Sequence, residues 1–178
     1  MAFYHVPRFI FGPVADSKLC SGTILLPADF NGQLLEQVKE SGLTDIVTNT
    51  LENNIQDKAW WETQRGKIDW VIAVTQGLKE YTPWIIEYGL DIATQGVCIL
   101  DRITFLEPVR NRETFLKSAS LANLKILSPR PAFRADGKQL KDSVTSGWFF
   151  FKKQEQRFTG TVIDYEVSWL RPRPPTNE

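Results

Sequence analysis

One segment, residues 69 to 108, constrains the fold more than any other part of the chain. An apolar run at 69–73 leads into a short turn at 74–77, and a second apolar run follows at 97–105. Between them, aromatic and aliphatic side chains recur at helical spacing from about residue 79 to residue 94. Two buried strands joined by one helix lie parallel, with a right-handed crossover. The segment therefore predicts a parallel sheet within an α/β fold.

The same arrangement occurs once more near the start of the chain. A short apolar strand at 22–26 precedes a helix with Asn31 as its N-cap and Gly42 as its stop, and a second strand follows at 45–49. Farther on, strands are expected at 124–127, 147–152 and 161–169, the last two as an antiparallel hairpin, with a helix at about 110–120. The prediction is a single, doubly wound, mostly parallel sheet with an antiparallel C-terminal hairpin. One domain would span residues 1–170, followed by a mobile proline-rich tail at 171–178.

Composition excludes several classes of protein. With 178 residues, 42% of them hydrophobic, the chain is long enough for one sizeable core. No run of eighteen apolar residues and no signal-peptide pattern is present, so we expect a cytoplasmic protein with no membrane partner. Cys20 and Cys98 are far apart in the sequence and His5 has no companion. A zinc or other metal site and histidine-based catalysis are therefore not expected.

Charge is unevenly distributed along a chain whose net charge is zero. Residues 1–101 hold 7 Lys/Arg and 13 Asp/Glu, which gives −6, and residues 102–178 hold 14 and 8, which gives +6. A basic C-terminal half fits a DNA backbone, because Lys and Arg neutralise phosphates and release counterions. The alternative is a solvated surface whose charges happen to segregate.

In sheets of this kind, ligands bind outside the carboxyl ends of the strands. The segments expected at this rim are residues 27–32, 48–52, 74–77 and 102–108. The first segment, residues 27–32 with the two residues after it, resembles the cofactor loop of adenine-specific DNA methyltransferases of phages and bacteria. The pattern of that loop in the family is roughly Pro-Cys-Ala-Gly-Asp-Gly-Ala-Leu. The chain has Pro-Ala-Asp-Phe-Asn-Gly-Gln-Leu there, and only the proline, the last glycine and the leucine match.

The resemblance implies a Rossmann-like methyltransferase fold and S-adenosylmethionine as the candidate cofactor. The loop positions that would hold this cofactor are Pro27, Asp29, Asn31 and Gly32, with Glu52 as a displaced ribose ligand, because Thr50 stands where the family has an acid. Phe30 replaces a glycine that lets the backbone approach the cofactor closely. These departures favour a chain that binds no cofactor.

The turn departs further from the family. At this position the family has the catalytic motif Asn/Asp-Pro-Pro-Tyr/Phe. Its polar groups accept hydrogen bonds from the exocyclic amine of the target base, and its aromatic ring stacks on the flipped base. At this position the chain has Val74, Thr75, Gln76 and Gly77. Valine has no acceptor and glycine cannot stack, although Thr75 or Gln76 could still bind an amine.

The likeness is stronger downstream, within a total span of about residues 24–151. The apolar strand ends in Arg-Ile-Thr-Phe-Leu-Glu-Pro, similar to the family's Arg-Leu-Ser-Phe-Leu-Glu-Pro, and Pro-Arg-Pro-Ala-Phe and Trp-Phe-Phe follow. The implied substrate- or DNA-binding residues are Arg102, Glu107, Arg110 and Arg130. Internal ion pairs are the alternative role for these charges, and the six tryptophans are expected in the core.

Two classes of function compete on the sequence, and a third possibility is a pocket that still binds a small nucleotide-like molecule without acting on it. The first is a methyltransferase-like protein that no longer methylates and serves as a binding or regulatory module for DNA or for a protein partner. The second is an active S-adenosylmethionine-dependent DNA (adenine) methyltransferase with an atypical turn. Loss of both the cofactor loop and the catalytic turn favours the first.

Overall fold

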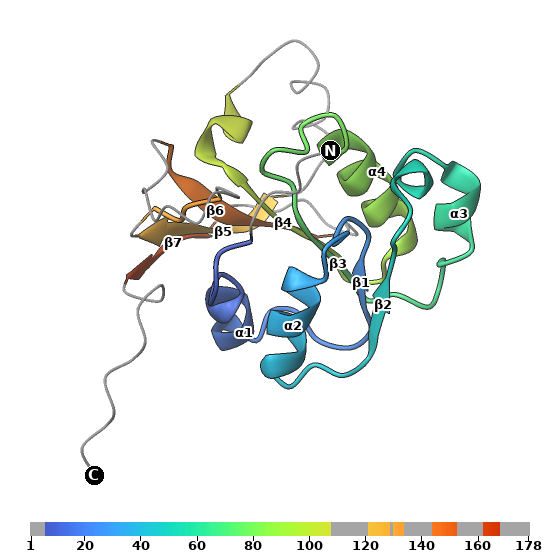
Figure 1. Ribbon diagram of the computed structural model, residues 1–178, viewed down its shortest axis with the longest axis horizontal. Helices are drawn as coiled ribbons and strands as arrows, with labels where there is room; N and C mark the ends of the chain where they lie inside the picture. The colour runs from blue at the N-terminus through green and yellow to red at the C-terminus, as the bar shows by residue number, and fades with distance from the viewer. Residues whose placement is uncertain (1–5, 108–120, 129, 134–143, 153–161, 168–178) are drawn as a thin grey trace.

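The computed structural model describes residues 6–107, 121–128, 130–133, 144–152 and 162–167, the last range for its backbone only. A seven-stranded sheet forms its centre, in the order β2-β1-β3-β4-β6-β5-β7 (Figure 1). The strands are β1 (Ile24–Leu26), β2 (Ile46–Thr48), β3 (Trp70–Val74), β4 (Gly96–Arg102), β5 (Leu121–Ser128), β6 (Ser146–Lys152) and β7 (Val162–Val167). The helices are α1 (Gly12–Ser17), α2 (Gln33–Glu40), α3 (Lys58–Glu62) and α4 (Thr82–Ile92), with short 3-10 turns η1 (Glu52–Ile55) and η2 (Ile103–Leu106).

The predicted doubly wound, mostly parallel sheet is confirmed. β1 pairs in parallel with β2 on one side and with β3 on the other, and β3 pairs in parallel with β4. The chain thus moves outward from β1 to β2 and then returns to β3, so the strand order reverses beside β1. This reversal is the place where such sheets bind ligands.

The antiparallel part of the sheet differs in detail from the expected hairpin. β6 lies between β4 and β5 and is antiparallel to both, whereas β7 pairs in parallel with β5. The consecutive strands that form an antiparallel pair are therefore β5 and β6, and the last two strands, β6 and β7, do not pair with each other. Insertion of β6 beside β4 buries its four consecutive aromatic residues, from Trp148 to Phe151.

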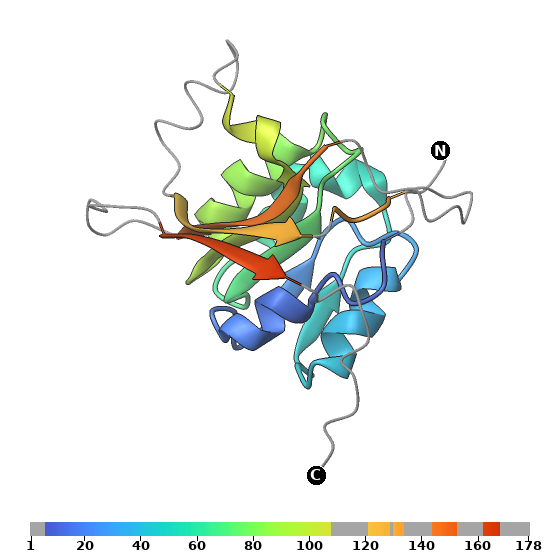
Figure 2. The same ribbon diagram turned by 90° about the vertical axis from the view of Figure 1, so that its left-hand side faces the viewer.

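Helices cover both faces of the sheet, with α1 and α2 on one face and α3 and α4 on the other (Figure 2). Side chains alternate between the two cores along each strand, as the two-residue period of a strand requires. In β3, for example, Trp70 and Ile72 pack in the first core, and Val71 and Ala73 pack in the second. Burial on both faces explains why β3 and β4 are almost continuously apolar.

The tryptophans are divided between core and surface. Trp61, Trp70 and Trp148 are buried, as predicted, while Trp60 is half-buried and Trp84 is 37% exposed. Trp169 and the expected helix at 110–120 lie outside the described residues. No helix among the described residues is long and apolar enough to cross a membrane.

The two cysteines are neighbours in space although 78 positions separate them in the sequence (98 minus 20). Cys20 and Cys98 are both buried in the first core as free thiols, and their side chains share a hydrogen bond. Burial raises the pKa of the Cys98 thiol well above its usual value, and Cys20 raises it further. Within the described part of the chain, no group of His, Cys, Asp and Glu side chains is arranged to hold a metal ion.

Candidate functional site

The rim at the carboxyl ends of the parallel strands brings the expected loops together. Asn49, directly after β2, joins the first two of them. Its backbone N–H donates to Leu26 O at 3.1 Å and its side-chain amide donates to Pro27 O at 2.9 Å. The loops after β1 and β2 therefore form one hydrogen-bonded unit at this edge of the sheet.

In the first loop, Asp29 rather than Asn31 caps helix α2. The Asp29 carboxylate is buried and accepts the N–H of Leu34 at 3.1 Å and the N–H of Leu35 at 2.7 Å. Gly32 takes the N-cap position with φ 71°, a left-handed conformation that suits glycine. Asn31 is exposed, and its side-chain oxygen accepts the N–H of Gln33 at 3.2 Å. A helix N-terminus is a natural anion site, and here a carboxylate of the chain itself takes up the two N–H groups.

The other loop residues are also engaged with the protein. Pro27 is buried and its carbonyl accepts from Asn49. The Phe30 ring is half-buried and packs against the second core, on the sheet face that carries α3 and α4. The aromatic side chain that replaces a glycine thus fills space inside the loop region and stabilises the fold.

Substitution of Asp29 tests this cap through its pH dependence. Burial raises the pKa of the Asp29 carboxyl above its ordinary 3.8, although the two backbone N–H groups oppose the shift. A raised folded-state pKa means that the stability gained from protonation is fully present below about pH 4 and is lost as pH rises through the folded pKa. Asp29→Ala is expected to cost about 1–2 kcal/mol at pH 7, and this cost should grow as pH falls.

The measurement is urea unfolding of wild type and Asp29→Ala at several pH values between 4.5 and 7. Glu40→Ala is the matched control, because Glu40 is an exposed carboxylate in the same helix. A difference between wild type and Asp29→Ala that shrinks as pH falls would contradict the proposed environment of Asp29.

After β2, the polar side chains of Asn49 and Glu52 form hydrogen bonds with other groups of the protein. Asn49 is 4% exposed, and its amide also donates to Leu51 O while its oxygen accepts from Leu51 N and Asn54 Nδ2. Glu52, the predicted ribose ligand, accepts from the Tyr81 hydroxyl at 3.3 Å. Burial and this carboxylate together raise the pKa of Tyr81. Glu52 therefore links η1 to the start of α4.

The turn after β3 has both of its polar side chains directed inward. Thr75 is fully buried, and its hydroxyl donates to Asp101 Oδ2 at 2.7 Å. Gln76 is 1% exposed, and its side-chain oxygen accepts the Ser146 hydroxyl at 2.6 Å. Val74 is buried, and Gly77 is exposed with φ 90°. The groups that could have bound an amine thus take part in a buried network that ties β3 to β4 and β6.

The sequence did not identify two partners in this network, Asp101 and Ser146. The Asp101 carboxylate is 7% exposed and accepts from Thr75, from the Thr82 hydroxyl at 3.5 Å and from the Arg102 N–H at 2.7 Å. The signal that could have revealed it is an acidic residue at the end of an apolar strand, because a buried carboxylate requires donors.

An open pocket of about 590 Å³ lies at the same rim, where β4 ends and β6 begins. One hydrogen bond joins η2 to the residue before β6 in the wall of this pocket: Ile103 N donates to Thr145 O at 2.9 Å. The lining residues are Ile103, Thr104, Leu106, Glu107, Arg130, Val144 and Thr145. Two predicted substrate residues, Glu107 and Arg130, therefore meet in one pocket, while Arg102 is not among its lining residues. Arg110 lies outside the described residues.

Known structures share this fold. The structure superimposes on a protein from Listeria monocytogenes assigned as a class I S-adenosylmethionine-dependent methyltransferase, with a TM-score of 0.54 and 13% identity over 93% of this chain and 66% of that one. It also superimposes on the modification subunit of an assigned type I restriction enzyme from Vibrio vulnificus, with a TM-score of 0.55 and 12% identity over 92% of this chain and 46% of that one. No protein-family model and no curated protein matches the sequence.

These similarities show the methyltransferase fold. The chain spans slightly less than two thirds of the first of these proteins and less than half of the second.

Proposed function

We propose that this chain is a methyltransferase-fold protein that does not transfer methyl groups and acts inside the cell as a binding or regulatory module. One observation carries the proposal: Thr75 and Gln76, the only polar side chains of the turn, are buried and hydrogen-bonded to Asp101 and Ser146. General acid–base or amine-activating groups act only within hydrogen-bond reach of their substrate. Side chains directed into the sheet do not meet this requirement.

The residues present do not fit S-adenosylmethionine either. The N–H groups of Leu34 and Leu35 bind Asp29, and the Asn49 amide binds backbone carbonyls. A bound cofactor would have to displace these internal partners and would gain no net hydrogen bonds. We therefore assign no role to S-adenosylmethionine in the function of this chain.

We further propose that the chain descends from adenine-specific DNA methyltransferases of phage or bacterial origin. The support is the downstream motif pattern, together with the rim pocket that Glu107 and Arg130 both line. Arg130 is exposed and belongs to the half of the chain with a net charge of +6, which favours DNA as the partner. A protein partner is the alternative.

A gel-shift series with duplex DNA at rising salt tests DNA binding. We expect binding at low salt that weakens steeply, and Arg130→Ala should reduce affinity several-fold and lower the salt slope by about one. Lys39→Ala is the control, because Lys39 is an exposed cation in the last turn of α2. Absence of any shift at low salt would exclude DNA and leave a protein partner.

A tritium-transfer assay from labelled S-adenosylmethionine to unmethylated DNA tests the absence of catalysis. We expect no incorporation. Incorporation by wild type above a control without protein would refute the proposal and would favour the active DNA (adenine) methyltransferase with an atypical turn.

A further inference from the structure

The turn at residues 7–10, just before α1, holds a bulky residue in a backbone conformation that favours glycine. Ile10 N donates to Pro7 O at 3.4 Å, and Phe9 occupies the third position of this turn with φ 67°. A positive φ at this position is typical of a type II turn, where glycine or asparagine is the usual residue. The conformation is unfavourable for phenylalanine, because its Cβ approaches the following carbonyl oxygen. Backbone strain of this kind persists only where the surrounding structure imposes it, and it is concentrated at functional sites.

Hydrogen bonds from two other elements hold the turn in this conformation. The Gln37 amide of α2 donates to Pro7 O at 2.9 Å, and Trp148 Nε1 of β6 donates to Ile10 O at 2.9 Å. The residues on both sides of the turn's tip are buried, whereas Phe9 is 39% exposed. The fold therefore keeps the Phe9 ring at the surface and fixes the strained backbone beneath it.

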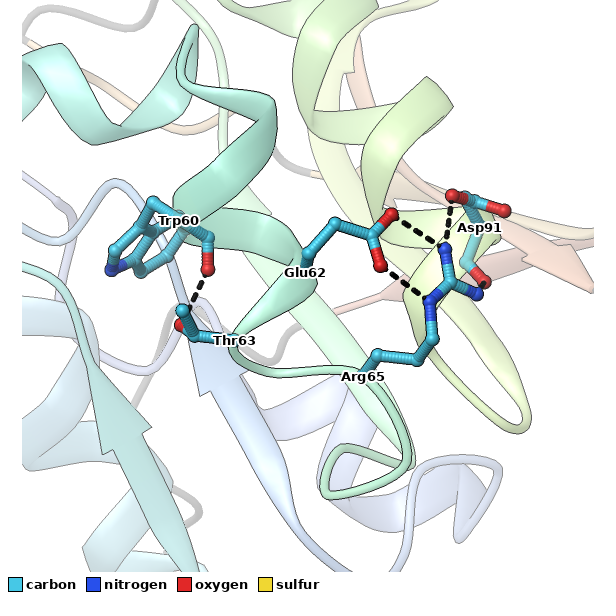
Figure 3. A network of polar contacts seen from close by, with 5 residues as sticks. All are labelled: Trp60, Glu62, Thr63, Arg65 and Asp91. Carbon is cyan, nitrogen blue, oxygen red and sulfur yellow. Dashed lines mark hydrogen bonds and ion pairs between the residues drawn. The ribbon is translucent and has the colours of Figure 1, made fainter.

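The two exposed side chains at the tip of the turn form a cation–π contact, which we call the Arg8–Phe9 pair. The Arg8 guanidinium lies 5.2 Å from the centroid of the Phe9 ring. Among the described residues, no carboxylate pairs with Arg8. Arg65, in contrast, is held by Glu62 at 2.7 Å and by Asp91 at 2.5 Å (Figure 3). The Arg8–Phe9 pair thus presents a flat apolar ring beside a positive charge that is available to an anion.

A nucleotide with an unpaired base carries the complementary groups, a flat base next to a phosphate. Aromatic rings stack on bases that are splayed out of a helix, and a guanidinium binds the phosphate. A carboxylate of a protein partner would engage Arg8 but would offer no flat ring to Phe9. We propose that the Arg8–Phe9 pair binds single-stranded DNA, with a base stacked on Phe9 and a phosphate bound by Arg8. This inference rests on the proposed function in that DNA is the partner, but neither residue lines the rim pocket.

The experiment titrates the full-length chain into a fluorescently labelled single-stranded DNA of about 12 nucleotides at low salt and follows anisotropy. We expect saturable binding by wild type. Phe9→Gly should weaken it at least about five-fold, because one stacked base is lost, and Phe9→Trp should retain affinity within about two-fold. Arg8→Ala should weaken binding several-fold and reduce the slope of log affinity against log salt by about 0.7.

Thermal melting of the same variants separates a ring kept for binding from a ring kept for packing. Glycine adopts a positive φ without strain, so Phe9→Gly should leave the melting temperature unchanged or raise it by a few degrees. Lys18→Gly is the matched control, because Lys18 is an exposed cation with φ 54° directly after α1. It should behave in the same way during melting and should leave DNA binding unchanged.

Three results would overturn the proposal. The first is equal affinity of wild type and Phe9→Gly for single-stranded DNA, and the second is a melting temperature of Phe9→Gly that falls by several degrees. The third is a lack of single-strand binding by wild type, which would leave a protein partner for the Arg8–Phe9 pair. Duplex DNA measured in parallel keeps the two proposals apart. Duplex binding without single-strand binding contradicts this inference alone, and Phe9-dependent single-strand binding without duplex binding contradicts only the contact at the rim pocket.

Discussion

Replacing Gln76 with alanine is expected to lower the free energy of unfolding by about 2 to 4 kcal/mol. The side chain is 1% exposed, so its removal leaves a cavity in the rim. It also leaves the buried Ser146 hydroxyl without the acceptor that it meets at 2.6 Å. An unsatisfied buried donor costs more than the net gain from a satisfied hydrogen bond. A residue kept for chemistry alone would show a much smaller effect.

Chemical denaturation of Gln76→Ala, Ser146→Ala and the double variant gives the coupling between the two side chains. We expect a coupling of about 1 kcal/mol or more, because the groups are in direct contact. Gln95→Ala, at an exposed glutamine before β4, is the control and should change stability by less than about 0.5 kcal/mol. Additive effects of the two substitutions would show that the contact does not support the fold.

Gly96→Ala is expected to destabilise the protein by about 3 kcal/mol or to prevent folding. A Cβ at this position would lie 2.2 Å from the carbonyl oxygen of Phe151 and 3.0 Å from the Trp70 ring. The carbonyl belongs to β6, whose residues Phe151 and Lys152 are in register with the first residues of β4. The backbone is fixed by this ladder, so it has little freedom to move away.

Gly12→Ala is the matched control for that substitution. Gly12 starts α1, and no atom lies within 4 Å of a Cβ added there. The free energy of unfolding of Gly12→Ala should therefore stay within about 0.5 kcal/mol of wild type or rise slightly, because alanine restricts the conformations of the unfolded chain. Equal stabilities of the two variants, measured by thermal and urea unfolding, would mean that β6 does not lie beside β4 as described.

The parallel part of the fold follows from local patterns in the sequence. The apolar runs at β3 and β4, the helical spacing between them and Pro83 in the first turn of α4 each identify their element without distant information. The position of β6 does not follow, because the choice between β4 and β7 as its neighbour depends on contacts between distant segments. The α2 cap illustrates the same limit. The sequence pattern predicted Asn31 as the cap, but Asp29 is the residue whose carboxylate reaches the N–H groups of Leu34 and Leu35.

The sequence predicted that the loops of the candidate site lie at the rim, but it did not predict the orientation of their side chains. Parallel strands end at one rim, so the loops after β1, β2, β3 and β4 were expected to meet, and Asn49 joins the first two of them through hydrogen bonds. The inward orientation of the Thr75 and Gln76 side chains depends on Asp101 and Ser146, which are 26 and 70 residues away in the sequence, respectively. No local pattern contains that information.

The central claim is that the rim has lost the groups that serve S-adenosylmethionine, because its donors and acceptors are used within the protein. Calorimetric titration of the full-length chain with S-adenosylhomocysteine tests it most directly, since the product binds wherever the cofactor site is intact. We predict no saturable heat at ligand concentrations up to about 1 mM, a limit that excludes binding more favourable than about −4 kcal/mol. A micromolar dissociation constant would contradict the account.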